Sequence, residues 1–191
     1  LTLGALAQRL LALASLEPLP VAVAPVVDAG GVHQRERIAT IAEWACASGV
    51  PGDLLELGVY SGETTVMLAA VASRYGRRVV AIDDWKPGTE YRLAEEIRPV
   101  FYNRIAGYRG IVDAMELDGT SEQFRSAIVG RTLAFAFVDA SKGHEENLAY
   151  LRAVMPWCLG PVAVDDAYSV DVLRACDQAA RAAPPWVHLR H

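Results

Sequence analysis

The 191-residue sequence lacks an excess of positive charge, because 18 lysines and arginines are outnumbered by 23 aspartates and glutamates. This balance offers no basic surface to a nucleic-acid backbone, so nucleic acid is not expected as a partner. The sequence is also poor in cysteine: Cys46, Cys158 and Cys176 are scattered and show no CxxC spacing. They indicate reduced, packed thiols of a cytoplasmic protein rather than a disulfide framework or a zinc site.

A long uninterrupted apolar run is missing as well, although the chain opens with a Leu- and Ala-rich stretch. Residues 1–27 have no basic start, and Gln8, Arg9, Glu17 and three prolines interrupt them. A membrane span needs about 20 consecutive apolar residues, and a signal peptide needs a basic beginning. We therefore expect neither, and no membrane partner. Because no methionine opens the sequence, we expect it to be trimmed.

Helical and strand patterns alternate along the chain. Leucines at helical spacing predict a helix over residues 2–16, which a Pro-rich connector follows. We assign residues 1–32 to an N-terminal extension and residues 33–191 to the main domain. Apolar strands are predicted over 53–59, 78–83, 110–117, 133–140, 161–166 and 186–190. Helices are predicted over 33–48, 62–75 with Ser61 as the N-cap, 90–106 with a break before Pro99, 121–129, 145–155 and 170–182.

Near-continuous apolar strands that alternate with helices predict an α/β fold: a doubly wound, mostly parallel, Rossmann-like sheet with helices on both faces. Ligands of such sheets bind outside the carboxyl ends of the strands. Almost every predicted strand ends in an acid, and these acids are Glu56, Asp83, Asp118, Asp139, Asp165 and Asp166. The strand ends are therefore the expected functional edge.

The first strand end, "ELGVYSGETT", has glycines only at 58 and 62. It lacks the GxGxxG fingerprint and the GxxxxGK[ST] loop, which disfavours an NAD-linked oxidoreductase. Glu56 suits a cationic or donor-rich ligand, and the two glycines let the backbone approach that ligand closely. Asp83 lies where an acid accepts hydrogen bonds from ribose hydroxyls, with Asp84 as the alternative.

These features together resemble the class I S-adenosylmethionine-dependent methyltransferases: Glu-x-Gly-x-x-x-Gly, an acid ending the second strand, and "DGTS" after the third. The resemblance covers about residues 36–191 and implies S-adenosyl-L-methionine as the methyl donor. It implies cofactor contacts at Glu56, Gly58, Ser61, Gly62, Asp83, Trp85, Gly119, Thr120, Ser121 and Asp139. The final antiparallel strand of the family is missing or trimmed here, and an open sheet edge invites pairing into a homo-oligomer.

The segments "VDASK" and "VDDAY" are similar to those of the metal-dependent O-methyltransferases, both the catechol and caffeoyl-CoA type and the macrolide- and aminocoumarin-sugar type. The similarity implies Mg²⁺ or a similar divalent cation held by Asp139, Asp165 and Asp166. Two adjacent carboxylates repel each other, and a cation reverses that penalty. It also implies methyl transfer to a hydroxyl of a small metabolite, either a sugar or polyol, which the Asp-Asp pair favours, or a catechol-like compound.

The same resemblance makes Lys142 the general base, with His144 as the competing candidate. Tyr168 is expected either to border the acceptor or to pack against the sheet end. Three other readings stay open: a metal-independent methyltransferase, a non-catalytic methyltransferase-like binding module, and the NAD-linked oxidoreductase that the missing glycine disfavours.

Overall fold

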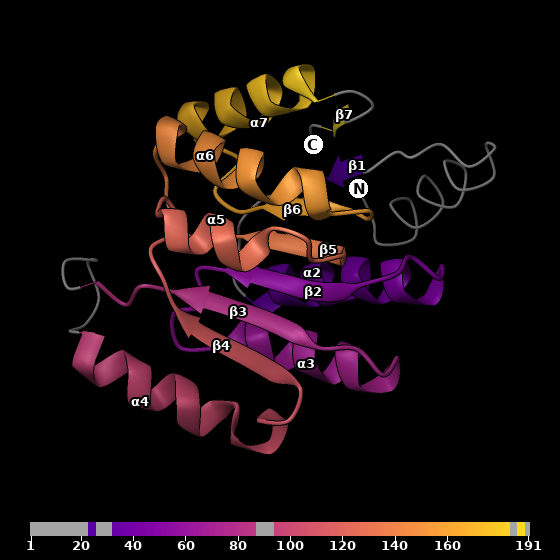
Figure 1. The fold of residues 1–191 in the computed structure, drawn as a ribbon, viewed down its shortest axis with the longest axis vertical. Helices are drawn as coiled ribbons and strands as arrows, with labels where there is room; N and C mark the ends of the chain where they lie inside the picture. The colour runs from indigo at the N-terminus through magenta and orange to yellow at the C-terminus, as the bar shows by residue number, and fades with distance from the viewer. Residues whose placement is uncertain (1–22, 26–31, 87–93, 184–186, 190–191) are drawn as a thin grey trace.

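The computed structural model describes residues 23–25, 32–86, 94–183 and 187–189. A sheet of five parallel strands lies between two layers of helices (Figure 1). The strands, in the spatial order β4-β3-β2-β5-β6, are Val112–Glu116, Val79–Asp83, Asp53–Leu57, Leu133–Val138 and Val162–Val164. The predicted doubly wound α/β fold is confirmed, and the order reverses direction beside β2, the position where such sheets bind ligands.

The helices divide into two layers according to the apolar core in which they lie. On one face of the sheet are α2 (Val32–Ala47), α3 (Glu63–Arg74) and α4 (Ala94–Arg104). On the other are α5 (Glu122–Ile128), α6 (His144–Val154) and α7 (Val170–Ala182). Two short 3₁₀ turns, Ala106–Tyr108 and Met155–Trp157, follow α4 and α6. Because the sheet is covered on both faces, its central strands are apolar at almost every position.

Two helix predictions need correction. We expected a break before Pro99, but α4 continues through it. Proline removes one backbone donor there, while Ile97 and Phe101 on either side are buried in the core and hold the helix in place. We also expected Ser61 to cap α3, but the N-cap is Gly62, and the Ser61 hydroxyl accepts a hydrogen bond from Arg104 instead.

The predicted strand over 186–190 is present as β7 (Val187–Leu189), but its partner is unexpected. It pairs in parallel with β1 (Val23–Pro25), a segment that the sequence predicted as connector. Within the described residues every strand pairing is parallel. The predicted N-terminal helix over 2–16 lies outside the described residues.

All three cysteines are free and buried, as the sequence predicted. Burial raises the pKa of each thiol above its ordinary value. These cysteines are therefore core residues.

In the part of the chain that the structure describes, no helix has the length and apolarity to cross a bilayer.

The carboxyl ends of β2, β3 and β5 are tied together by backbone hydrogen bonds. Gly58 N–H donates to Ile82 O and Asp139 N–H to Leu57 O, both at 2.8 Å. Gly58 has φ +89°, and a Cβ at this position would overlap the backbone carbonyl of Asp139. Only glycine fits where these two strand ends meet.

We predict that Gly58→Ala lowers the free energy of unfolding by about 3 kcal/mol or more. Alanine is strained at the positive φ of this position, and its Cβ would overlap the Asp139 carbonyl. Gly107→Ala is the matched control, since Gly107 has an ordinary φ and open space around its Cβ position. The control should stay within about 0.5 kcal/mol of the unmodified chain. Urea denaturation of both variants measures the difference, and equal midpoints would contradict the packing argument.

Candidate functional site

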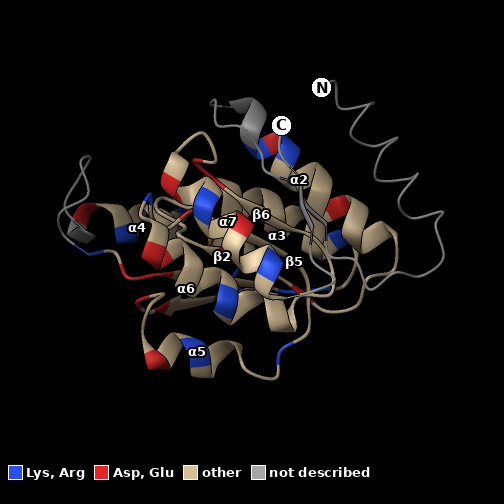
Figure 2. Ribbon diagram, turned by 90° about the horizontal axis from the view of Figure 1, so that it is seen from above, with Lys and Arg blue, Asp and Glu red and all other residues tan. Residues whose placement is uncertain are grey.

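Acidic side chains gather at one edge of the sheet. Several red loop segments lie on the left of Figure 2, the side on which the arrowheads of β2, β3 and β4 end in Figure 1. Each of the strands β2 to β6 has an acid at or just after its carboxyl end, as the sequence predicted. Parallel strands bring their carboxyl ends to one side, so residues far apart in the sequence meet there.

Asp139, Asp165 and Asp166 converge at the ends of β5 and β6. Each offers a carboxylate oxygen, and the three oxygens lie within 4.8 Å of one another. Asp139 as a whole residue is exposed to solvent, yet its carboxyl group is desolvated by the surrounding strand ends. That desolvation is the larger cause, and the charge of Asp165 the second, of a pKa of Asp139 well above the usual range of an aspartate. A cluster of this kind either retains a proton or binds a cation.

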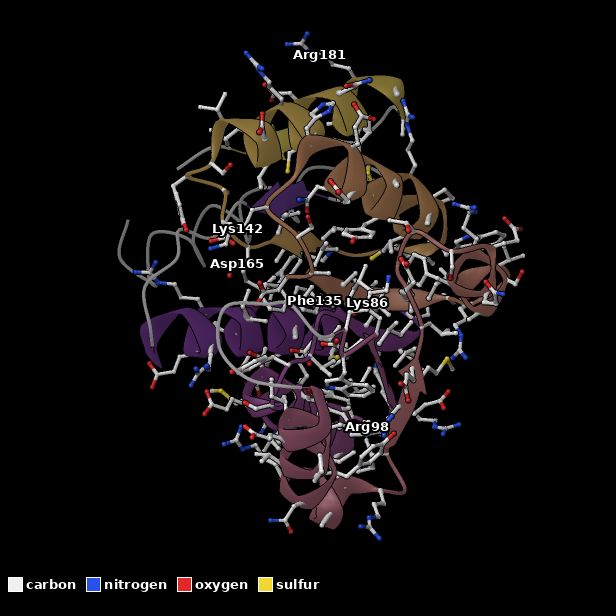
Figure 3. All side chains as sticks on the ribbon, turned by 90° about the vertical axis from the view of Figure 1, so that its left-hand side faces the viewer. Lys86, Arg98, Phe135, Lys142, Asp165 and Arg181 are labelled. Atoms are coloured by element: carbon white, nitrogen blue, oxygen red, sulfur yellow. The ribbon has the colours of Figure 1, made fainter. Side chains whose placement is uncertain are left out.

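Lys142 is the cation that the structure places beside this cluster. Its Nζ lies 3.7 Å from Asp166 Oδ2, and its side chain is 70% exposed. Figure 3 looks onto this edge and shows the labelled Lys142 and Asp165 close to each other. Asp166 itself has φ +53°, which turns the chain sharply after β6, and it accepts a hydrogen bond from the exposed Tyr168.

His144 points to a different neighbourhood. It begins α6, its Nδ1 lies 3.0 Å from Glu145 Oε1, and it lines a surface cavity with α7 residues that include Arg174 and Gln178. Lys142 contacts the acidic cluster, whereas the contacts of His144 are with α6 and α7.

Glu56 is buried inside the sheet edge, with 1% of its surface exposed. Thr65, in the first turn of α3, donates a hydrogen bond of 2.6 Å to Glu56 Oε2. Burial, opposed by this hydrogen bond and reinforced by the charge of Asp83, raises the pKa of Glu56 to about 8. The group is therefore poised to lose its proton when a positive charge arrives nearby.

Asp83 ends β3 and holds the glycine loop of residues 58–62. Its two carboxylate oxygens accept from the backbone N–H of Tyr60 at 2.8 Å and of Trp85 at 2.7 Å. Tyr60 and Trp85 both have positive φ, so these hydrogen bonds stabilise two strained turns. The predicted ribose ligand is thus also a structural acceptor for the glycine loop, to which the backbone of Val59 contributes as well.

Trp85, expected as a cofactor contact, is 6% exposed. Its ring packs against Phe101 and Tyr102, and its indole N–H donates to Tyr60 O at 3.0 Å. In this structure Trp85 supports the glycine loop from within the core.

The loop after β4 borders the same edge. Gly119 lies so close to the Tyr150 ring and Leu57 that a Cβ would be 2.8 Å from Tyr150 Cε1. Thr120 donates its backbone and side-chain hydrogens to Asp118, and Ser121 caps α5. These contacts give the loop a fixed shape beside the ends of β2 and β3.

Three contributors to this edge were missed from the sequence. Thr65 carries no motif, and its role depends on α3 packing over β2. Lys86 bridges Asp84 and Asp118, and the only sequence signal was its place after the second-strand acids. Arg104 reaches the glycine loop from α4, a segment that the sequence identified only as a crossover helix.

We predict that Glu56→Gln makes the ligand-free protein more stable, increasingly so at higher pH. The folded chain keeps a proton on Glu56 up to about pH 8, whereas the unfolded chain releases it near 4.5. Wild-type stability therefore falls as pH rises between these values. Glutamine keeps an acceptor oxygen for Thr65 and cannot ionise, so its advantage should grow by roughly 1 kcal/mol per pH unit.

Chemical denaturation of this variant at several pH values between 5 and 8 measures that advantage. Glu122→Gln serves as the control, because Glu122 is exposed and should follow the wild type at every pH. A Glu56→Gln advantage that does not change with pH would contradict the raised pKa.

Comparison with known proteins identifies the family. A family model for the methyltransferase domain matches residues 55–166. Among solved structures, the O-methyltransferase NovP has a TM-score of 0.59 at 18% identity, covering 80% of this chain and 72% of that one. Cofactor-bound Rv0187 from MTB has a TM-score of 0.58 at 23% identity, covering 95% and 79%. No curated protein matches the sequence.

At these identities the solved structures demonstrate a shared fold. The family match spans more than half of the chain and includes the glycine loop, Asp83 and the three clustered aspartates. The chain belongs to the methyltransferase domain family and is an S-adenosylmethionine-dependent methyltransferase.

Proposed function

We propose that this methyltransferase transfers its methyl group to a hydroxyl oxygen of a small metabolite, with Asp139, Asp165 and Asp166 holding a divalent cation. The observation that carries this proposal is the convergence of the three carboxylates within 4.8 Å, with Lys142 beside them. Carboxylate oxygens are hard ligands of the kind that Mg²⁺ prefers, and the pKa of Asp139 is raised by burial and by the charge of Asp165, a penalty that a cation would offset.

When bound, a divalent cation would lower the pKa of an acceptor hydroxyl and offset the attraction of Asp166 for the Lys142 ammonium. Lys142, as the neutral amine, is then placed to take the hydroxyl proton. The acceptor oxygen attacks the methyl carbon, the carbon–sulfur bond breaks, and sulfur keeps the electron pair as the thioether of S-adenosylhomocysteine. The contact of Lys142 with the acidic cluster favours it over His144 for this role.

The cofactor is proposed to lie over the glycine loop, between Asp83 and the loop of residues 119–121. Gly58 and Gly62 let the loop pack closely on the Asp139 backbone and on Phe101, and Asp83 at its edge is an acceptor for ribose hydroxyls. Glu56 beneath the loop gives the sulfonium and ammonium groups a carboxylate that can ionise when they bind. The Asp165–Asp166 pair supports a sugar or polyol acceptor, and the buried thiols support a cytoplasmic location.

Chelation tests the requirement for metal. EDTA should reduce turnover by at least tenfold, and added Mg²⁺ should restore it, because the acceptor hydroxyl is a poor nucleophile without a Lewis acid. Methyl transfer from labelled S-adenosylmethionine to a panel of sugars, polyols and catechols provides the readout. Full activity under chelation would identify a metal-independent methyltransferase, and cofactor binding without any transfer would identify a binding module.

Asp139→Asn should abolish most of the activity and weaken Mg²⁺ binding measured by calorimetry, because it removes a charged ligand from the cluster. Asp171→Asn is the control: it makes the same exchange at an exposed residue in the first turn of α7, outside the cluster. Equal Mg²⁺ affinity of the two variants would rule out Asp139 as a ligand.

A further inference from the structure

The C-terminal half of α4 contacts the glycine loop of residues 58–62 from the core side. The Phe101 ring lies so close to Gly62 that a Cβ there would be 2.7 Å from its Cδ2 atom. Phe101 also packs against Trp85, which donates to Tyr60 O. One helix therefore supports both ends of the turn formed by Tyr60, Ser61 and Gly62.

Arg104, at the end of α4, makes the polar part of this contact. Its Nη1 donates to the Ser61 carbonyl at 2.8 Å and to the Ser61 hydroxyl at 2.7 Å. Its Nη2 lies 3.3 Å from Glu63 Oε1, and Glu63 also pairs with Arg35 of α2. Ser61 and Glu63 thus approach one guanidinium group from the loop and from the first turn of α3.

This contact determines which hydrogen bonds Ser61 can still make. A guanidinium group only donates, so the Ser61 hydroxyl uses a lone pair toward Arg104 and keeps its own hydrogen for an acceptor. The Ser61 carbonyl already has a donor. The hydrogen of the Ser61 hydroxyl is therefore not used by Arg104 and can be donated to a carboxylate such as that of S-adenosylmethionine.

We propose that Arg104 is a positioning residue for S-adenosylmethionine: it fixes the Ser61 backbone and orients the Ser61 hydroxyl so that its hydrogen is donated to the cofactor. The inference rests on the proposed placement of the cofactor over the glycine loop. It does not depend on the metal or on the acceptor, because it concerns cofactor binding alone.

Arg98 provides a matched control on the same helix. Its Nη1 donates to Glu116 of β4 at 2.7 Å, and its side chain is 45% exposed, compared with 34% for Arg104. Figure 3 labels Arg98 on α4. Both arginines join α4 to another element by an ion pair, and of the two only Arg104 is hydrogen-bonded to the glycine loop. A purely structural role would affect both variants alike.

The test compares Arg104→Ala with Arg98→Ala by titration calorimetry with S-adenosylhomocysteine and by steady-state kinetics. Arg104→Ala should weaken binding and raise KM for S-adenosylmethionine about tenfold, with kcat at saturating cofactor within about twofold of wild type. Arg98→Ala should leave both the affinity for S-adenosylhomocysteine and the KM for S-adenosylmethionine unchanged. Thermal unfolding of the two ligand-free variants should show similar decreases in Tm, so that lost stability does not explain their different cofactor affinities.

Ser61→Ala and the double variant complete a cycle. If Arg104 acts through Ser61, the double variant should bind about as weakly as Arg104→Ala alone. Arg104→Lys, which keeps the charge and can donate to one Ser61 oxygen, should recover part of the affinity.

Wild-type affinity in Arg104→Ala, equal losses in Arg98→Ala, or additive effects of Ser61→Ala and Arg104→Ala would each overturn the inference. If Arg104→Ala does not fold, Arg104→Lys and Ser61→Ala decide the question: loss of binding supports the inference, and wild-type affinity in both overturns it. A wild-type chain that does not bind S-adenosylhomocysteine would overturn the cofactor placement together with this inference. Normal wild-type binding with an unaffected Arg104→Ala variant would remove only the inference.

Discussion

The carboxyl ends of β2 and β5 meet at residues 57, 58 and 139, where the two backbones are in direct contact with no side chain between them. The hydrogen bond from Asp139 N–H to Leu57 O brings β2 and β5 together beyond their regular pairing, and Gly58 allows it because its missing Cβ leaves room for the Asp139 carbonyl. From this junction the chain leaves β2 into the glycine loop and leaves β5 toward Lys142. The glycine loop and the acidic cluster therefore both begin at one backbone contact.

The functional edge is also a concentration of negative charge that the fold must accommodate. Burial keeps a proton on Glu56, which also accepts a hydrogen bond from Thr65, while Asp83 accepts hydrogen bonds from the backbone of Tyr60 and Trp85. Asp118 receives Lys86, which holds its pKa near 2, and Asp166 faces Lys142. Asp139 resembles Glu56, because burial and the charge of a neighbouring carboxylate both oppose its ionisation. Glu56 and Asp139 therefore tend to keep a proton, whereas Asp118 tends to stay ionised, within one small region.

The alternation of apolar strands and helices was sufficient to predict the sheet, because burial on both faces leaves a continuous apolar signature in β2, β3 and β5. The convergence of Asp139, Asp165 and Asp166 also followed, since parallel strands must end at one edge. Side-chain partners could not be predicted in this way. That Trp85 turns inward and that Arg104 reaches Ser61 depend on how α4 packs, and no local pattern encodes this packing. β1 escaped prediction because a short Pro-flanked strand lacks periodicity.

The pairing of β1 with β7 joins residue 23 to residue 187, positions near opposite ends of the sequence. Closing so long a loop costs chain entropy before any local contact compensates for it, so this ladder should form after the central sheet during folding. Three residues on each side give it few hydrogen bonds, and it should open by itself in the native state. Amide hydrogen exchange would then be faster in this ladder than in β2 or β5.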